Sequence, residues 1–241
     1  MNENKDIDDH SVVQSNSLIT ASQRLTLNEK RLVVAAISKL DPKKDLPKNG
    51  IRIYAEEMVE AFDVDEKNAY RLLQQAGRSL IRRIWTIKGR SPFNGKPSII
   101  ERHWVIEAEY QEGEGWVRIM FHPKTAPFLV KMSKNFTSYK LKTTGALRSM
   151  YSWRMLENMS RHVDEETGEG KWAVYVDDFH HAMDTPPSLR KNFTELRRRA
   201  IEPAIKELKK DWKIEYTVKK RGRKISSLIF TFEREDQQDL F

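Results

Sequence analysis

The sequence predicts an α+β protein built from two tandem copies of one small module. Three observations support this fold class: a diverged internal repeat, the same order of helices and strands in both halves, and an alternating apolar pattern that ends each half. The chain has 241 residues, of which 39% are hydrophobic, with six Trp and ten Phe. That is enough apolar material for two cores of ordinary domain size.

The internal repeat is clearest where residues 51–62 (IRIYAEEMVEAF) pair without a gap with residues 172–183 (WAVYVDDFHHAM). Each copy has the pattern of a short strand that runs into a helix. After a small insertion in the second copy, the next helices also pair, and their inward positions are Ala69, Leu72, Ala76, Leu80 and Ile84 in the first copy and Phe193, Leu196, Ala200, Ala204 and Leu208 in the second. A strand then begins at Trp85 and at Trp212.

A helix is also expected upstream of each copy. Thr26 and Glu29 have the spacing of a capping box, so a helix should cover 27–40 and end before Pro42. Its counterpart covers 146–161. Downstream of each copy we expect a hairpin, with strands 104–110 and 116–121 in the first and alternating strands that flank 221–223 in the second.

Helix, strand, helix, helix and hairpin follow one another in the order of a winged-helix module. The sequence therefore predicts two tandem winged-helix domains, residues 15–139 and 140–232, related by an internal pseudo-repeat. An acidic N-terminal tail (1–14) precedes them, and an acidic C-terminal tail (233–241) follows.

The charge distribution favours a polyanionic partner. The net charge is +8, but residues 1–10 and residues 233–241 each carry −3, so the body between them carries +14. Such an excess attracts phosphates and releases their counterions. RNA, DNA and acidic lipid all satisfy this requirement.

Other classes are disfavoured by composition. The absence of cysteine excludes disulfides and thiolate zinc sites, and the longest apolar run, residues 32–37, is far shorter than the roughly 20 residues that cross a bilayer. The acidic start has the wrong charge for a signal peptide. We expect a cytoplasmic protein.

The third helix of a winged-helix module enters the major groove, where side chains read base edges. In the second copy, the face opposite the inward positions holds Lys191, Asn192, Glu195, Arg198 and Arg199. A solvated charged face is the simpler meaning of such a stripe. Residues 190–224, however, contain fourteen Lys and Arg against five acids, and this excess favours DNA contact.

The tip of the second hairpin forms a cationic wing, which we expect to bind phosphates without reading sequence. Its residues are Lys219, Lys220, Arg221, Arg223 and Lys224. A basic loop that binds nucleic acid in general is the alternative interpretation.

The first copy is less charged. The outward residues of its reading helix (66–84) are Lys67, Asn68, Arg71, Gln74, Gln75 and Arg78, whose side chains suit base edges, whereas its hairpin tip, residues 112–115, is acidic. We expect weaker DNA contact from this half, with its hairpin or first helix available for a protein interface. Leu18, Leu25 and Leu32 recur every seven residues; core packing is favoured over a short zipper because Thr26 begins a new helix.

No pattern indicates catalysis, a metal or a cofactor. Glu56-Glu57 and Asp177-Asp178 occupy the same place in both copies, the first turn of a helix, where acids interact well with the helix dipole. His180 and His181 are adjacent and do not form an i, i+4 ligand pair. We expect no enzyme, because a phosphate-binding glycine loop and the paired histidines of nicking enzymes are both absent.

Several motifs together resemble the iteron-binding replication initiator (Rep) proteins of bacterial plasmids. They are residues 193–204 (FTELRRRAIEPA), 216–224 (YTVKKRGRK) and 228–232 (LIFTF), with Asn68-Ala69-Tyr70 and Leu147-Arg148-Ser149-Met150-Tyr151 at the start of two other helices. The likeness extends over roughly residues 17–232.

The resemblance implies a bacterial protein, associated with a nucleoid or a plasmid, and a fuller function. Family members bind repeated origin sites, the iterons, as monomers, promote opening of the duplex and recruit the host initiator DnaA and the helicase DnaB. As dimers they repress their own gene at an inverted repeat, with the first domain at the dimer interface and chaperones promoting monomers. The family's recognition helix corresponds to 191–199 and its wing to 219–224. A transcriptional repressor without initiator activity and a DNA-cleaving enzyme are the alternatives.

Overall fold

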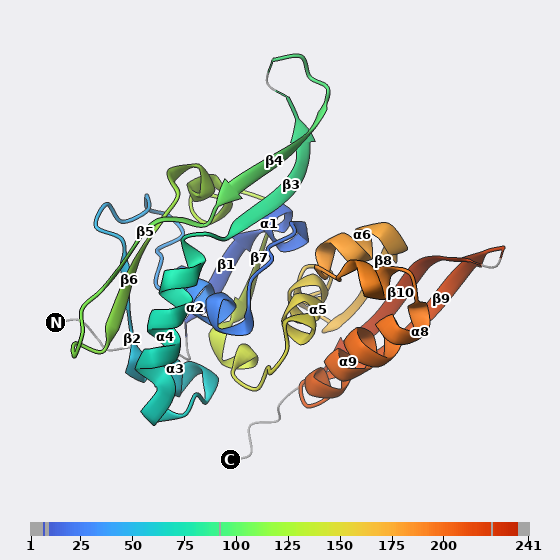
Figure 1. The fold of residues 1–241 in the computed structure, drawn as a ribbon. Coiled ribbons are helices and arrows are strands. Elements are labelled where there is room, and N and C mark those ends of the chain that lie inside the picture. The colour runs from blue at the N-terminus through green and yellow to red at the C-terminus, as the bar shows by residue number, and fades with distance from the viewer. Residues whose placement is uncertain (1–6, 8–9, 92, 223, 236–241) are drawn as a thin grey trace. The chain divides into compact units, whose positions relative to one another are not determined.

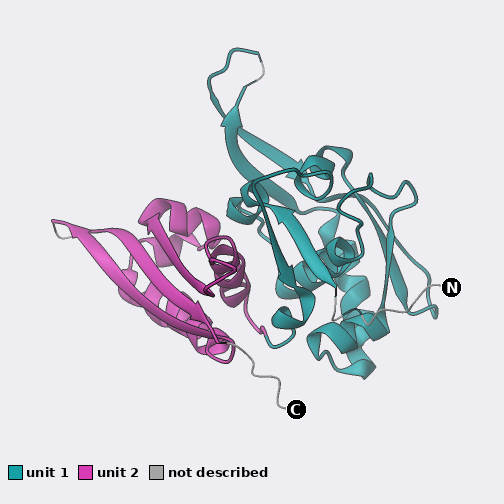
Figure 2. Cartoon of the chain, turned by 180° about the vertical axis from the view of Figure 1, so that it is seen from behind, with its two compact units in different colours: residues 1–146 teal, residues 147–241 magenta. Residues whose placement is uncertain are grey.

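The computed structural model describes residues 7, 10–91, 93–222 and 224–235, and divides into two compact units, residues 1–146 and 147–241 (Figures 1 and 2). Much of both acidic tails, and Arg223 of the wing, therefore lie outside the described residues. The division comes after the expected boundary at 139 because β7 (Phe136–Lys140) pairs along its whole length with β1 (Ser11–Ser15). Hydrogen bonds between these strands hold residues 136–140 in unit 1.

Unit 1 contains the expected winged-helix order. Its helices and sheet strands are α2 (Leu27–Ser38), β2 (Ile51–Tyr54), α3 (Ala55–Phe62), α4 (Glu66–Leu80), β5 (Val105–Tyr110) and β6 (Trp116–Phe121). The strands form an antiparallel sheet in the order β2-β6-β5. The capping box at the start of α2 is confirmed: the Thr26 amide donates to Glu29 Oε2 at 2.7 Å, and Thr26 Oγ1 accepts from the Glu29 amide at 3.4 Å.

The three heptad-spaced leucines pack in the core of unit 1. Leu18, in α1 (Asn16–Thr20), and Leu32, in α2, are 0% exposed, and Leu25, in the segment between the helices, is 7% exposed. Because the chain leaves the helical conformation between α1 and α2, the leucines do not line one continuous helix. The core interpretation is confirmed.

Unit 1 also has elements that the sequence pattern did not indicate. These are the β1–β7 ladder, the short 3₁₀ helices η2 (Pro123–Phe128) and η3 (Leu141–Thr144), and β4 (Pro97–His103), which pairs with β3 (Ile84–Arg90), the strand expected from Trp85. The β3–β4 hairpin, called the arm below, projects from the rest of the unit (Figure 1). Apolar and polar residues do not alternate over 97–103, because the two isoleucines of β4 are adjacent in sequence. The sequence pattern therefore did not indicate this strand.

Unit 2 repeats the module. It contains α5 (Met150–Ser160), β8 (Glu169–Tyr175), α6 (Val176–Ala182), α7 (Pro187–Arg190), a long helix over 193–208, β9 (Trp212–Arg221) and β10 (Lys224–Arg234). The sheet order is β8-β10-β9. Its core is aromatic: the ring centroids of Trp172 and Phe230 are 5.1 Å apart, and those of Phe179 and Phe230 are 5.8 Å apart.

A buried charge connects two helices of unit 2. The Arg154 side chain on α5 is 0% exposed and lies 3.1 Å from the carboxylate of Glu157. Arg154 Nε also donates to the carbonyl of Ala182, the last residue of α6, at 2.6 Å. A charged group is stable in this interior because its hydrogen bonds are satisfied.

The long helix of unit 2 is not regular, contrary to the sequence prediction. It consists of α8 (Phe193–Leu196), a π turn at Arg197–Ile201 and α9 (Glu202–Leu208). In unit 1 the helix α4 is α-helical throughout, but Leu73, rather than Leu72, takes the inward position: Leu73 is 0% exposed and Leu72 is half-buried. The inward assignment of Leu72 was therefore wrong. That of Ile84 was wrong too, because α4 ends at Leu80 and Ile84 begins β3.

Candidate nucleic-acid interface

The reading helix of unit 2 presents a continuous row of arginines. Arg197, Arg198 and Arg199 are all exposed, while Leu196 and Ala200 on either side of them are buried. Glu195 lies at the edge of this row and is half-exposed. The row is therefore free of apolar residues and carries three adjacent cations.

Two expected readers lie just before the helix. Lys191 is the C-cap that follows α7, and Asn192 is the N-cap of α8, where its Oδ1 accepts a hydrogen bond from the Glu195 amide at 3.2 Å. Their placement on the outward face of the helix was wrong, because the short α7 interrupts the chain there. Both side chains remain exposed.

Ion pairs within the helix orient two of the arginines. Arg198 Nη2 lies 2.9 Å from Glu195 Oε2, and Arg197 Nε lies 3.3 Å from Glu202 Oε1. The hydrogen bond from Arg198 lowers the pKa of the Glu195 carboxyl, and the same bond raises the pKa of Arg198. Both groups are therefore charged throughout the neutral pH range.

The wing of unit 2 is a long antiparallel hairpin with cations at its tip. Lys224 pairs with Arg221, and Gly222 turns the chain with φ +63°, a left-handed conformation that glycine adopts without cost. The described cations Lys219, Lys220, Arg221 and Lys224 are exposed, as predicted; Arg223 lies outside the described residues. A register shift between Ile225 and Ser227 bends the returning strand near the tip.

In unit 1 the reading helix carries a connected polar row. Arg71 donates from Nη2 to Asn68 Oδ1 at 2.8 Å and from Nη1 to Gln75 Oε1 at 3.5 Å, so one guanidinium aligns two amide side chains. Asp65 caps the helix by accepting from the Lys67 amide at 2.9 Å. Such a row suits base edges more than phosphates.

The remaining expected readers of unit 1 differ in exposure. Gln74 is half-buried, and Arg78 is exposed with its guanidinium carbon 4.9 Å from the ring centroid of Tyr110. Tyr70 donates from its hydroxyl to the carbonyl of Gln111 at 2.8 Å. These contacts tie the reading helix to the hairpin β5–β6, at whose acidic tip Glu112 and Glu114 are exposed.

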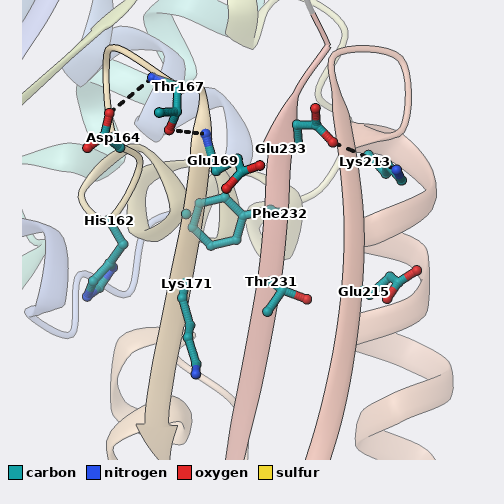
Figure 3. A pocket seen from close by; sticks show the side chains of 11 residues that line it. His162, Asp164, Thr167, Glu169, Lys171, Lys213, Glu215, Thr231, Phe232 and Glu233 are labelled. Carbon is teal, nitrogen blue, oxygen red and sulfur yellow. Dashed lines mark hydrogen bonds and ion pairs between the residues drawn. The ribbon is translucent and has the colours of Figure 1, made fainter.

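The sheet of unit 2 has a hollow of 780 Å³ at one end (Figure 3). Lys171, Thr231 and Glu215 lie in one row across its three strands, on the face opposite the aromatic core. Amides of Thr167 and Glu166 lower the pKa of Asp164 at its rim. Lysines and carboxylates alternate in this hollow, so it lacks the single sign of charge that phosphate binding requires.

The carboxylate pairs have structural roles. Glu56, Glu57, Asp177 and Asp178 occupy the first turns of α3 and α6, as predicted. Glu57 accepts from the Tyr54 amide at 2.8 Å and pairs with Lys39 at 2.6 Å. Within the described ranges, no three His, Asp or Glu residues are arranged to hold a metal ion. In the same ranges, no helix combines the length and apolar character needed to span a membrane.

Comparison with solved structures shows the fold. The chain superimposes on the crystal structure of the Pi initiator protein in complex with iteron DNA with a TM-score of 0.79, over 95% of this chain and 99% of that one, at 22% sequence identity. The two tandem winged-helix domains predicted from the sequence are thereby confirmed.

Sequence comparison identifies the family. Residues 11–160 match the model of the initiator replication protein WH1 domain, and residues 175–232 match that of the initiator Rep protein WH2 domain. A replication initiation protein of Escherichia coli is 25% identical over 95% of this chain and 71% of its own length. An uncharacterised 27.6 kDa protein of the same organism is 24% identical over 90% of this chain and 93% of its own length. The chain therefore belongs to the family of initiator replication proteins.

Proposed function

We propose that this protein initiates replication of a bacterial plasmid by binding iterons in the origin with the reading helices of both units. The observation that carries the proposal is the row Arg197–Arg199, exposed on a helix beside a cationic wing, in a chain of the initiator family. Arginine reads guanine with two hydrogen bonds, and the wing cations bind phosphates. The related Pi initiator was crystallised with iteron DNA, which supports the choice of ligand.

A homodimer that represses its own gene is the second part of the proposal. The arm of unit 1 exposes Phe93 (95%) and Ile99 (73%), the two most exposed large hydrophobic side chains among the described residues. Exposed apolar groups of this size favour burial against a partner surface. A second copy of the chain is the partner that the family resemblance implies, with monomers binding the iterons.

The proposed setting is the bacterial cytoplasm. The protein acts there without enzymatic activity and without a cofactor, and it recruits the host initiator DnaA and the helicase DnaB, while chaperones convert dimers to monomers. In this scheme the initiator supplies sequence recognition and duplex distortion, and the host proteins supply the chemistry of unwinding.

The test is permanganate footprinting on a supercoiled plasmid that carries the origin, with and without the host initiator. We expect unpaired thymines beside the bound repeats only when the protein is present. Binding without reactive thymines would indicate a transcriptional repressor, and metal-dependent strand cleavage would indicate a nuclease. A variant with Arg198→Ala and Arg199→Ala is the control, since it should leave the origin closed.

A further inference from the structure

One turn of the reading helix in unit 2 differs in hydrogen bonding from the corresponding turn in unit 1. The helix α4 is α-helical throughout, whereas Arg197–Ile201 form a π turn. The spacing of the paired positions is the same in both helices: Leu80 follows Ala69 by eleven positions, and Ala204 follows Phe193 by eleven. The difference is therefore confined to the backbone of one turn.

The π turn contains the arginines. Between Leu196 and Ala200 lie Arg197, Arg198 and Arg199, and all three are exposed. Their side chains therefore leave the helix from the one turn whose backbone is not α-helical.

The backbone shows how this turn is built. The Glu202 amide donates to the carbonyl of Arg197, five residues earlier, where an α-helix would use a residue four earlier. A π turn of this kind accommodates one additional residue within an α-helix and is frequent at functional sites.

Pro203 follows the π turn directly. It has no amide hydrogen, and its ring conflicts with the carbonyl of the residue four positions before it, here Arg199. A regular α-helix cannot run through this position without cost. In the structure Pro203 lies in the first turn of α9, where an amide hydrogen is not needed. The π turn therefore lies directly before Pro203, where the helix has to accommodate the proline.

We infer that Pro203 is a positioning residue for DNA recognition. It holds the π turn at Arg197–Ile201 and thereby fixes the directions in which the three arginines leave the helix. This inference rests on the proposed function, because it assigns the π turn to the reading of bases. Without the proline, the turn is free to return to α-helical hydrogen bonds, and the arginines change direction.

The test compares two variants on two duplexes. The specific duplex is the one that wild-type protein selects from random DNA, and the other is a random duplex of the same length. Pro203→Ala should lower the ratio of the two affinities about tenfold, since misplacing a base contact has roughly that effect. Its affinity for random DNA should stay within about twofold because the charge is unchanged. Its melting temperature should not fall, since proline is an unfavourable residue within a helix.

The second variant combines Pro203→Ala with deletion of Arg198, which removes one residue from the π turn so that the helix can be α-helical throughout, as α4 is. Its matched control is Arg198→Gln, which removes the same charge and keeps the spacing. We expect the deletion to change the selected sequence at several neighbouring bases and the control to relax it at one. If thermal melting shows that the deletion variant does not fold, the affinities of Pro203→Ala for the two duplexes alone test the inference.

Two results would overturn the inference: an unchanged affinity ratio and selected sequence for Pro203→Ala, or an equal loss on both duplexes. Arg199→Ala is measured in parallel to separate this failure from failure of the proposed function. If Arg199→Ala lowers the affinity ratio and Pro203→Ala does not, only the role of Pro203 is lost. If neither lowers it, the helix does not read bases.

Discussion

The ion pair between Glu195 and Arg198 determines how the free protein holds a side chain that we propose reads bases. The pair is exposed, so it contributes little to folding stability. Its effect is on geometry, because the carboxylate keeps the guanidinium along the helix at 2.9 Å until another acceptor replaces it. Glu195 is itself able to accept a hydrogen bond from cytosine, so both members of the pair have candidate partners on DNA.

The arginines and the wing lysines should respond differently to substitution. Arg198→Ala or Arg199→Ala should weaken binding to the selected duplex by about 1 to 3 kcal/mol and relax the sequence requirement at one base. Lys220→Ala should weaken binding to specific and random DNA alike, because a phosphate contact carries no sequence information. Titration of each variant on both duplexes checks this, and equal losses on both for all three variants would contradict the base-reading assignment.

Unit 2 should lose stability on mild acidification. His180 is buried, with Nδ1 2.7 Å from Thr185 Oγ1; burial, and then the charge of Arg190, lower its pKa. The unfolded chain therefore takes up the proton first as the pH falls below about 6.5, and folding becomes less favourable. His162, whose pKa burial also lowers, adds to the same trend.

We expect the melting temperature to fall between pH 7.5 and 5.5, and His180→Asn to reduce that dependence. Thermal unfolding followed by circular dichroism measures both. The same substitution at exposed His103 in unit 1 is the control. A melting temperature that rises on acidification would contradict the assignment.

At the scale of elements, the two hairpins of the repeated module differ in charge at their tips. The tip of β9–β10 exposes Lys219, Lys220 and Arg221, whereas residues 112–115 in unit 1 contain two glutamates and no cation. Under the proposed function, the same hairpin geometry serves phosphate binding in unit 2 and avoids it in unit 1.

Replacing the three exposed wing cations Lys219, Lys220 and Arg221 by alanine should reduce the salt dependence of binding. Each phosphate contact contributes about 0.9 to the slope of log affinity against log salt, so the slope should fall by about two to three. Binding titrations at several salt concentrations measure it. Alanine at Lys206, Lys209 and Lys210, which are exposed in the same unit, is the charge-matched control. An equal fall in the control would indicate general attraction rather than contact by the wing.

Substitutions in the arm should shift the protein toward monomers. Phe93→Ser with Ile99→Thr removes the exposed apolar groups and keeps a β-branched residue in β4. We expect the dimer dissociation constant to rise at least about tenfold, which corresponds to about 1.4 kcal/mol. Sedimentation measures the change, and Ile106→Thr, at another exposed position of unit 1, is the control. An unchanged constant would exclude the arm as the interface.

At the scale of the whole molecule, the proposal requires both units to contact one duplex. Each reading helix occupies one major groove, and two neighbouring grooves on one face extend over about two helical turns, so the footprint should be ~20 base pairs. Hydroxyl radical footprinting on the selected duplex measures it. A protected region of about ten base pairs would indicate that one unit alone reads DNA.

The duplicated architecture was predictable because both copies keep the apolar spacing that defines a strand followed by a helix, from Ile51 and from Trp172. The wing was predictable because Gly222 lies between cations and alternating strands flank it. The strand β4 of the arm was not predictable, because the adjacent Ile99 and Ile100 conceal the alternation of apolar and polar residues. The π turn was not predictable from the sequence either. The spacing of Leu196, Ala200 and Ala204 suits a regular α-helix equally well, and only the hydrogen bond from Glu202 to Arg197 distinguishes a π turn from an α-helical one.

The buried guanidinium of Arg154 has a consequence for genetics. Selections for plasmids that fail to be maintained will recover substitutions at Arg154 alongside those at Arg198, and both exchange an arginine of unit 2. Arg154 lies in the interior and anchors α5 to the end of α6, so its loss lowers the amount of intact protein in the cell. An immunoblot of each mutant strain therefore has to precede any assignment of an arginine to the DNA surface.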